Sequence, residues 1–310
     1  MQVTFIIPLY NALARTRECL RTLQATLPPG LAHEVLFVDD GSTDGTREWL
    51  AGLTAPCRAV LNQRNLGFGG ACNRGAEAAR GGLFFFLNSD LVLRPGWFQP
   101  MQATFAHRAD AAVVGNVQLN ALTRAVDHAG LRFDHKGKPG HIRELPPGAG
   151  LFRWRRVPAV TGACFAIRAE VWRELGGFDE GFLNGGEDVD LCLRARAAGR
   201  HNYLALRSTV LHHVSASPGR KRRDEQNSRR LALRWRDAIT ALALPAWCRH
   251  HLETRWHGTR DPAGHAEARQ ILLFHLGLLH KPPLFAWRAM QQALDREQER
   301  WEKLLGSSAS

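Results

Sequence analysis

Five short apolar runs near the start of this chain constrain its fold more than any other feature. Helix-like segments, including residues 44–53 and 70–79, separate them. The runs are VTFII (3–7), EVLFV (34–38), RAVLN (58–62), LFFFL (83–87) and AAVVGNV (111–117). Continuous apolar strands that alternate with helices are typical of a parallel sheet covered by helices on both faces. We therefore predict an α/β fold with a mostly parallel central sheet.

Polar side chains follow three of these predicted strands at the point where each strand ends. Ligand sites in parallel sheets lie beyond the carboxyl ends of the strands. The residues concerned are Tyr10, Asn11, Asp39, Asp40, Asn88, Ser89 and Asp90. Asp90 is the most informative, because apolar residues flank it and a buried carboxylate is costly unless it is paired or bound to a metal. We expect a binding site at this edge of the sheet.

The middle of the chain is less regular. Residues 120–160 are rich in Gly, Pro and His, and they indicate a long connection with short strands. Residues 162–167 and 202–211 are strand candidates. Residues 187–199 form a helix pattern that Gly199 would close.

The composition changes after Ser217. Residues 219–236 contain eight basic and two acidic residues, and this net charge of +6 is half of the +12 of the whole chain. Helical patterns follow this basic run. Their apolar faces are formed by Leu231, Trp235, Ile239 and Leu242, and by Trp287, Leu294, Trp301 and Leu305 within residues 284–305. We therefore place a first domain at residues 1–217, and a basic linker with a C-terminal helical extension at residues 218–310.

Several function classes are disfavoured by the composition. No run approaches the roughly 20 uncharged apolar residues that a membrane-spanning helix needs. The first residues, MQVTFIIPLYN, lack the basic leader of a signal peptide. The six cysteines are scattered without a CxxC pair, which favours neither a disulfide framework nor a zinc site. These features predict a cytoplasmic protein.

The stretch VDDGSTDGT (38–46) places two carboxylates directly after a strand. Asp39 and Asp40 are either turn residues or acceptors of hydrogen bonds from a nucleobase or a ribose hydroxyl. Asp44 is placed to cap the helix that follows. The glycine-rich NLGFGGACNRG (65–75) does not match a phosphate-binding loop, and close packing of a helix on the sheet explains its small residues equally well.

Asp90 and His212 are candidate metal ligands. Mg²⁺ and Mn²⁺ prefer oxygen ligands, and one protein carboxylate suffices where a bound diphosphate supplies further oxygens. His212, in LHHVSAS (211–217), ends a predicted strand and would bind the same cation or a phosphate. The alternatives are a surface turn for Asp90 and a structural role for His212.

Glu187 and Asp188 stand at a predicted helix start, after Gly185 and Gly186. Carboxylates favour helix N-termini electrostatically, so helix capping is one interpretation. The other is a general base on a mobile loop, with Asp188 taking the proton of an attacking hydroxyl.

Taken together and in order, these motifs resemble the glycosyltransferase family 2 enzymes, especially the rhamnosyltransferase-like branch. The matching series is IIPLYN, VDDGSTDGT, NLGFGGACNRG, FLNSD, TGACFAIRAEVWRELGGFDEGF, GEDVDLCLRARAAG and HHVSAS. It covers roughly residues 3–217, and residues 218–310 lie outside the resemblance. The resemblance implies a GT-A fold, which joins a Rossmann-like nucleotide-binding half (about 1–118) to an acceptor-binding half (about 119–217).

The resemblance also implies roles for individual residues. Tyr10 would stack on the nucleobase, Asp40 would hydrogen-bond that base, and Asp39 would lie close to the nucleoside. Asp90 would bind Mn²⁺ or Mg²⁺ on the donor diphosphate, with His212 near the metal. The further residues expected to contact the nucleotide sugar are Pro8, Asn11, Asn65 and Ser89.

On the acceptor side, the resemblance makes Asp188 the catalytic base and Glu187 a residue that places the acceptor or the loop. Gly162 and Ala163 would line the acceptor. One position departs from the family pattern, because Asn88 replaces the first acid of the DXD motif. The cation site therefore loses a negative charge and depends more on the oxygens of the donor.

The resemblance implies an inverting glycosyltransferase that uses a dTDP- or UDP-linked sugar, with rhamnose favoured. The acceptor would be a glycan or a lipid-linked glycoconjugate of the cell wall or cell surface. The alternative is a catalytically silent nucleotide-sugar-binding or scaffolding protein of the same fold. A sugar nucleotidyltransferase is disfavoured, because PLYNALART is not the basic glycine-rich loop of those enzymes.

The basic run at residues 219–236 has two interpretations. It is either a solvated linker or a contact with anionic lipid at the inner face of the membrane. Nucleic-acid binding is disfavoured, since aromatic residues do not interleave with the basic ones as they would on a stacking platform.

Overall fold

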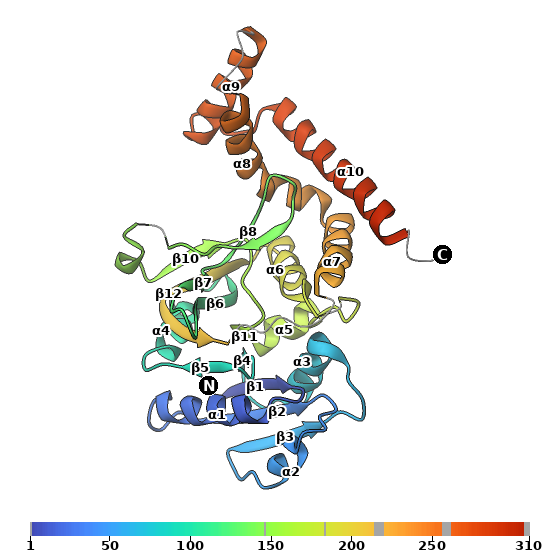
Figure 1. Cartoon of the computed structure of the whole chain (residues 1–310). Helices are drawn as coiled ribbons and strands as arrows, with labels where there is room; N and C mark the ends of the chain where they lie inside the picture. Colours follow the sequence, from blue (N-terminus) through green and yellow to red (C-terminus); the bar gives the residue numbers. More distant parts are fainter. Residues whose placement is uncertain (1, 146, 183, 214–219, 256–261, 307–310) are drawn as a thin grey trace. The chain divides into compact units, whose positions relative to one another are not determined.

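The computed structural model describes residues 2–145, 147–182, 184–213, 220–255 and 262–306 (Figure 1). The chain divides into two compact units. The first comprises residues 1–131 and 141–220, and the second comprises residues 132–140 and 221–310.

A mixed sheet forms the centre of the first unit. All five apolar runs of the sequence are strands of this sheet, as predicted. Its strands, in spatial order, are β10 (Trp154–Val157), β12 (His201–His212), β6 (Ala111–Asn120), β11 (Cys164–Arg168), β4 (Leu83–Leu87), β1 (Val3–Leu9), β2 (His33–Asp39) and β3 (Cys57–Leu61). Short β5 (Leu91–Leu93) pairs with β12, and β7 (Val126–His128) pairs with β6. The prediction of an α/β fold with a mostly parallel sheet is confirmed.

Strand β11 runs against its neighbours. It pairs antiparallel with both β4 and β6, whereas β1, β2, β3 and β4 pair in parallel. The start of β11 therefore lies at the edge where β4 ends. This reversal brings a later part of the chain to the carboxyl ends of the first strands.

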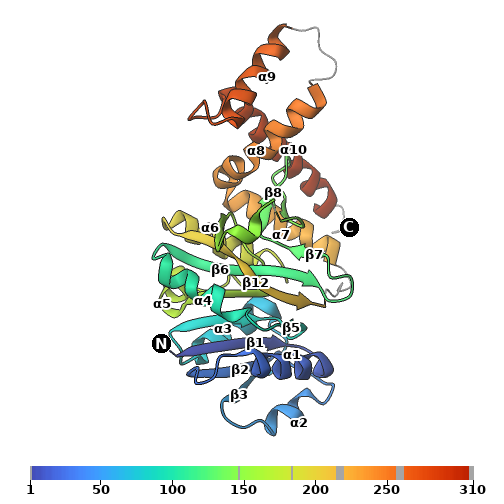
Figure 2. The same cartoon turned by 90° about the vertical axis from the view of Figure 1, so that its left-hand side faces the viewer.

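Helices cover both faces of the sheet. They are α1 (Leu13–Thr26), α2 (Thr46–Ala51), α3 (Gly67–Ala78), α4 (Phe98–His107), α5 (Ala169–Leu175) and α6 (Glu187–Ala197), with a 3₁₀ turn at Ala149–Leu151. Alternate residues of the strands divide between the two faces. Helices α1 and α4 lie on one side of the sheet (Figure 2). Phe5, Phe37 and Phe85 belong to the same buried cluster as residues of these helices. On the other side, Phe86 lies 4.7 Å from the ring of Phe165 and 4.5 Å from that of Trp172.

The second unit is largely helical. It contains α7 (Arg220–Arg234), α8 (Arg236–Arg255), α9 (Pro262–His275) and α10 (Leu284–Gly306), and most of the hairpin formed by β8 (Leu131–Phe133) and β9 (Pro139–His141). Glu225 of α7 accepts hydrogen bonds from Trp301 and Arg300 of α10 and from Lys138 of the hairpin. Glu225, one of the two acids of the basic run, therefore pairs inside this unit. None of the helices in the described ranges has the length and apolar character to span a bilayer.

Gly75 is the point where α3 approaches the sheet most closely. A methyl group added there would lie 2.5 Å from the side chain of Ile6 and 2.9 Å from that of Val38. Because cores are close-packed, we expect Gly75→Ala to lower the free energy of unfolding by about 1–3 kcal/mol in a chemical denaturation experiment. Gly52→Ala is the control, since its added carbon meets no atom closer than 3.5 Å. Equal stability of the two variants would contradict this packing.

Candidate active site

The polar residues predicted from the sequence gather at one edge of the sheet of the first unit. Strands β1, β2 and β4 end there, and β11 begins there, so that the Asn88 N–H donates to the Ala163 carbonyl (2.8 Å). Strand β12 is parallel to β6, and it delivers His212 to the same edge. The direction of each strand thus explains why distant segments meet.

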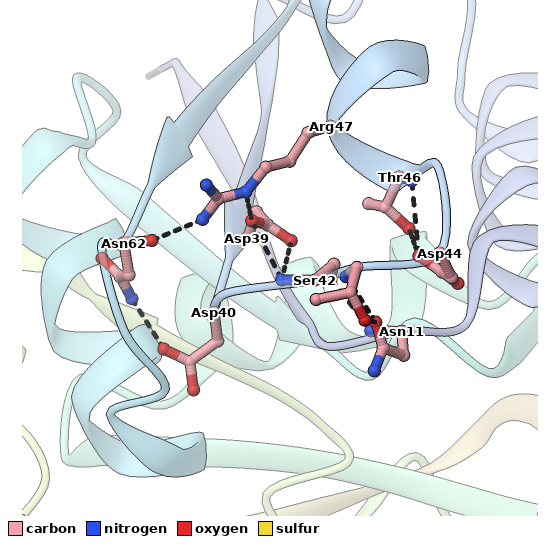
Figure 3. Close-up of polar contacts among 9 residues, drawn as sticks. Asn11, Asp39, Asp40, Ser42, Asp44, Thr46, Arg47 and Asn62 are labelled. Carbon is pink, nitrogen blue, oxygen red and sulfur yellow. Dashed lines mark hydrogen bonds and ion pairs between the residues drawn. The ribbon is translucent and has the colours of Figure 1, made fainter.

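The loops after β1 and β2 are tied to each other by side chains (Figure 3). The Asn11 N–H donates to Ser42 Oγ (2.9 Å), and Asn11 Oδ1 accepts from the Thr43 N–H (2.7 Å). Asn11 adopts a left-handed backbone conformation with φ of 44°, which asparagine tolerates better than most residues. Asn11 therefore fixes the shape of the loop that carries Tyr10.

Asp44 caps two helix starts. Its Oδ1 accepts hydrogen bonds from the backbone and hydroxyl of Thr46, at the start of α2, as predicted. Its Oδ2 accepts from the N–H groups of Ala12 and Leu13, at the start of α1. Hydrogen bonding from the Thr46 hydroxyl, more than any other contact, lowers the pKa of Asp44. Asp44 is thus a structural residue that joins the two loops.

Asp39 is buried and paired. Its Oδ2 accepts from Arg47 Nε (2.7 Å), and its Oδ1 accepts from the Ser42 N–H (3.2 Å). The same guanidinium donates to the carbonyl oxygen of Asn62 (2.6 Å). Asp39 therefore holds the start of the following turn and anchors α2.

Asp40 is also buried, and it binds the segment that leads into α3. Oδ1 accepts from Asn62 Nδ2 and from the Leu66 N–H, and Oδ2 accepts from the Gly67 N–H, all at 2.9 Å. An ionised carboxylate offers about four lone-pair sites, so these three donors leave about one open. Asp40 thus stabilises the N-terminus of α3 and keeps capacity for one further donor.

The loop before α6 is attached to the same helix. The Phe68 N–H donates to Asn184 Oδ1 (2.9 Å). Asn73 exchanges two hydrogen bonds of 2.9 Å with the backbone N–H and C=O of Phe178. Neither Asn73 nor Asn184 was predicted from the sequence as a site residue. The sequence signal for Asn184 was its position directly before Gly185 and Gly186, which is typical of a turn. In the structure Asn184 adopts a left-handed conformation with φ of 52°.

Glu187 and Asp188 begin α6, as predicted. Asp188 Oδ2 accepts from the Gly162 N–H (2.7 Å), and its Oδ1 accepts from the Val189 N–H (2.8 Å). Glu187 Oε2 accepts from the Gly185 N–H (2.7 Å) and is buried. The Gly162 contact joins α6 to the segment before β11.

Burial changes the proton affinity of both carboxyl groups. It raises the pKa of Glu187, and the neighbouring Asp188 charge raises it further. Burial also raises the pKa of Asp188, while hydrogen bonds from Gly162 and Val189 oppose that rise. A carboxylate with a raised pKa is a stronger base near neutral pH.

Asp90 and His212 face each other at a distance of 3.3 Å between Oδ1 and Nε2. Within the described part of the chain, Asp90 Oδ1 and His212 Nδ1 are buried atoms without a hydrogen-bond partner. Such atoms are costly unless a ligand satisfies them. The carboxylate oxygen suits Mn²⁺ or Mg²⁺, and a neutral imidazole is a common metal ligand. The pair therefore fits a divalent cation. The described residues form no group of three or more potential ligands, so further oxygens would have to come from a bound diphosphate.

His128 and His141, which were not predicted from the sequence, lie close enough to the site for their charges to interact with His212 and Asp188. His128 is fully buried, and its Nε2 accepts from the Thr161 N–H (3.3 Å), one residue before Gly162. Burial holds the pKa of His128 well below its usual value. The ring of His141 lies 4.9 Å from that of His128, and its charge, when present, lowers the pKa of Asp188. The only signal was the abundance of His in residues 120–160.

The other predicted residues are at the same edge. Tyr10 is 52% exposed at the end of β1, and Asn65 is exposed and accepts from the Gly67 N–H. Ser89 is half-buried beside Asp90, and Pro8 is buried within β1. Gly162 and Ala163 are buried directly before β11. A side chain at Gly162 would meet the ring of Phe68 at 3.0 Å, so glycine permits the close approach there.

Comparison with known proteins identifies the family. The family model described as Glycosyl transferase family 2 matches residues 4–176. The chain belongs to glycosyltransferase family 2. The uncharacterized protein y4gI of Sinorhizobium fredii is 32% identical to this chain. The match covers 72% of this chain and 26% of y4gI. The O-antigen biosynthesis protein RfbC of Myxococcus xanthus is 37% identical over 47% of the chain and 12% of its own length.

Solved structures support the GT-A fold. A structure of GalNAc-T7 with UDP, GalNAc and Mn²⁺ superposes with a TM-score of 0.65, at 16% identity, over 90% of this chain and 57% of that one. The mannosyltransferase PcManGT of Pyrobaculum calidifontis, in complex with GDP-Man and Mn²⁺, gives 0.57 at 19% identity, over 96% and 86% of the two chains. The predicted family and GT-A fold are therefore confirmed. The chain spans only a small part of the first curated relatives that it matches.

The raised pKa of Glu187 has a consequence for stability. A carboxyl group whose pKa is higher in the folded state stabilises the fold below its unfolded pKa, and this contribution is lost as the pH rises through the folded value. Between the unfolded and the folded pKa of Glu187, we expect the free energy of unfolding of the wild type to fall as the pH rises, by about 1.4 kcal/mol for each unit of pKa increase. Glu187→Gln should reduce this fall, because glutamine does not titrate. Denaturation at several pH values measures the difference. Exposed Glu77→Gln is the control and should follow the wild type.

Proposed function

We propose that this chain is an inverting glycosyltransferase in which Asp188 is the general base. The observation that carries the proposal is the Asp188 carboxylate at the start of α6, held by the Gly162 N–H and with a pKa that burial raises. Such a group takes a proton more readily near neutral pH than an ordinary aspartate does.

The reaction is a single displacement. The acceptor hydroxyl oxygen attacks the anomeric carbon of the donor while Asp188 takes the hydroxyl proton. The bond from that carbon to the diphosphate oxygen breaks, and the nucleoside diphosphate leaves with the bonding electron pair. One displacement inverts the configuration, and a second carboxylate nucleophile is not required. Glu187, beside the base, would place the acceptor or the loop.

The nucleotide would lie over the ends of β1 and β2. Tyr10, which is exposed there, would stack on the base. Asp40 would accept one donor from the base with its remaining lone-pair site. Asp39 would lie close to the nucleoside, and the residues expected to contact the rest of the donor are Pro8, Asn11, Asn65 and Ser89.

Asp90 and His212 would hold Mn²⁺ or Mg²⁺. The bound cation would stabilise the negative charge of the leaving diphosphate. Two relatives of similar fold were crystallised with Mn²⁺ together with UDP or GDP-Man, which supports a divalent cation here. Asn88 stands beside the site as a neutral residue, so the donor's own oxygens would contribute much of the binding.

The donor would be a dTDP- or UDP-linked sugar, with rhamnose favoured, and the acceptor a glycan or lipid-linked glycoconjugate. The similarity to an O-antigen biosynthesis protein supports a role in cell-surface polysaccharide formation. Residues 1–217 would bind donor and acceptor at the cytoplasmic side of the membrane, Gly162 and Ala163 lining the acceptor. A contact with lipid through residues 219–236 stays a prediction, and residues 214–219 lie outside the described part of the chain.

A catalytically silent nucleotide-sugar-binding protein is the second candidate. The observation that favours it is Asn88, which leaves Asp90 as the one carboxylate in the sequence NSD. Transfer assays decide between the two candidates.

The first test concerns the cation. We expect Mn²⁺ to raise the thermal unfolding temperature in the presence of a nucleoside diphosphate, because a ligand that binds the folded state stabilises it. His212→Ala and Asp90→Asn should each reduce this Mn²⁺-dependent increase. Asp237→Asn, at an exposed position of α8, is the matched control and should keep it. An unchanged Mn²⁺ response in both site variants would place the cation elsewhere.

The second test concerns the base. We expect Asp188→Asn to lower the transfer rate by about 10²–10⁴-fold, because asparagine cannot take the proton. Nucleotide binding, followed by thermal shift, should persist, since the substitution leaves Tyr10 and the donors on Asp40 unchanged. Asp237→Asn again serves as the control. Equal transfer by wild type and Asp188→Asn would refute the assignment, and absence of transfer by the wild type with every donor would favour the silent protein.

A further inference from the structure

The connection between α9 and α10 presents a group of exposed leucines. Large apolar side chains rarely remain exposed together on a soluble surface without a partner. Leu276 is 61%, Leu278 64% and Leu284 75% exposed. Leu272 and Leu279 are exposed next to them. We call residues 269–288 the leucine tip.

The backbone holds these leucines in place. The Gly277 N–H donates to the Phe274 carbonyl (3.0 Å), and the Leu278 N–H donates to the Leu273 carbonyl (2.9 Å). This is the Schellman pattern that closes a helix, and Gly277 supplies the required positive φ of 73°. In many such caps the residue after the glycine packs back on the helix, whereas Leu278 here points to solvent. The leucine tip is therefore an ordered apolar surface.

The charged residues of the leucine tip are all basic. Between Glu267 and Asp295 the sequence contains no acidic residue. Within that interval lie Arg269, Lys281 and Arg288, which are all exposed, together with His275 and His280. The leucine tip also contains two half-buried aromatic residues, Phe285 and Trp287. Exposed leucines with cations close to them in the sequence suit the interface between anionic headgroups and acyl chains.

We propose that the leucine tip docks on an anionic phospholipid bilayer. Leu276, Leu278 and Leu284 enter the interface, while Lys281 and Arg288 contact lipid phosphates. A second copy of this chain is a poorer occupant, because a symmetric pair would bring Lys281 and Arg288 of both copies together. The surface differs from the basic run at residues 219–236, whose Arg236 is bound to Asp295 within the second unit.

Vesicle flotation with the full chain tests the proposal. We expect binding to phosphatidylcholine vesicles that contain phosphatidylglycerol, and binding at least about tenfold weaker with phosphatidylcholine alone. The combined variant Leu276→Ser, Leu278→Ser, Leu284→Ser should weaken binding by about tenfold or more, because apolar burial is lost. Lys281→Gln with Arg288→Gln should remove most of the dependence on phosphatidylglycerol and on salt.

Matched variants separate this surface from others. Leu151→Ser with Phe152→Ser removes another exposed apolar pair, and Arg249→Gln removes an exposed cation of α8, and both should bind like the wild type. Circular dichroism checks that each variant is folded. If the combined serine variant unfolds, Leu276→Ser, Leu278→Ser and Leu284→Ser are tested one at a time. The nucleotide-dependent thermal shift should be unchanged in every variant, so failure here is distinct from failure of the proposed enzyme activity.

Three results would overturn the proposal. The first is equal flotation of wild type and the serine variants. The second is that flotation is lost in a variant outside the leucine tip and kept in the serine variants of the tip. Such variants are Leu151→Ser with Phe152→Ser, and Arg230→Gln with Arg234→Gln in the basic run. The third is a dimer of the wild type in sedimentation equilibrium that the serine variants dissociate, which would assign the leucine tip to a second copy of the chain.

Discussion

Hydrogen bonds to the start of α3 connect the two sides of the candidate active site. From β2, the Asp40 carboxylate accepts the N–H groups of Leu66 and Gly67. From the loop before α6, Asn184 accepts the next N–H, that of Phe68. The first backbone N–H groups of a helix have no partner within the helix. Asp40 and Asn184 supply the hydrogen-bond acceptors that these N–H groups of α3 need. The position of Asp188 therefore depends on the same helix end that fixes Asp40.

Burial and pairing divide the carboxylates of the site by role. Asp39 and Asp44 have strong donors and serve mainly to shape the loops. Glu187 and Asp188 are desolvated next to each other, which raises their pKa values and favours proton transfer. Asp90 and His212 keep buried atoms without hydrogen-bond partners, which suits a cation. The same residue type thus suits both the structural role seen in Asp39 and Asp44 and the basic and ligating roles that we propose, because its surroundings differ.

The sequence predicted the strands well and the site in part. Runs such as LFFFL are apolar throughout, so their burial on both faces was evident, but such a run carries no information on direction. The antiparallel β11 therefore needed the structure. The capping by Asp44 of the following helix was predicted, whereas its bonds to Ala12 and Leu13 join segments that are distant along the chain. His128 and His141 lay in an irregular stretch without periodicity, so no pattern marked His128 as buried.

The sequence by itself determined the fold class, the family and the edge of the sheet where the acidic residues stand. These follow from local patterns, since strand periodicity and motif order are properties of neighbouring residues. Only the tertiary structure decided which donors occupy Asp39 and Asp40, how Gly162 meets Asp188, and that Asp90 faces His212. Those contacts join segments far apart in the chain, and the pKa of a carboxylate is set by the burial and the donors that such contacts create.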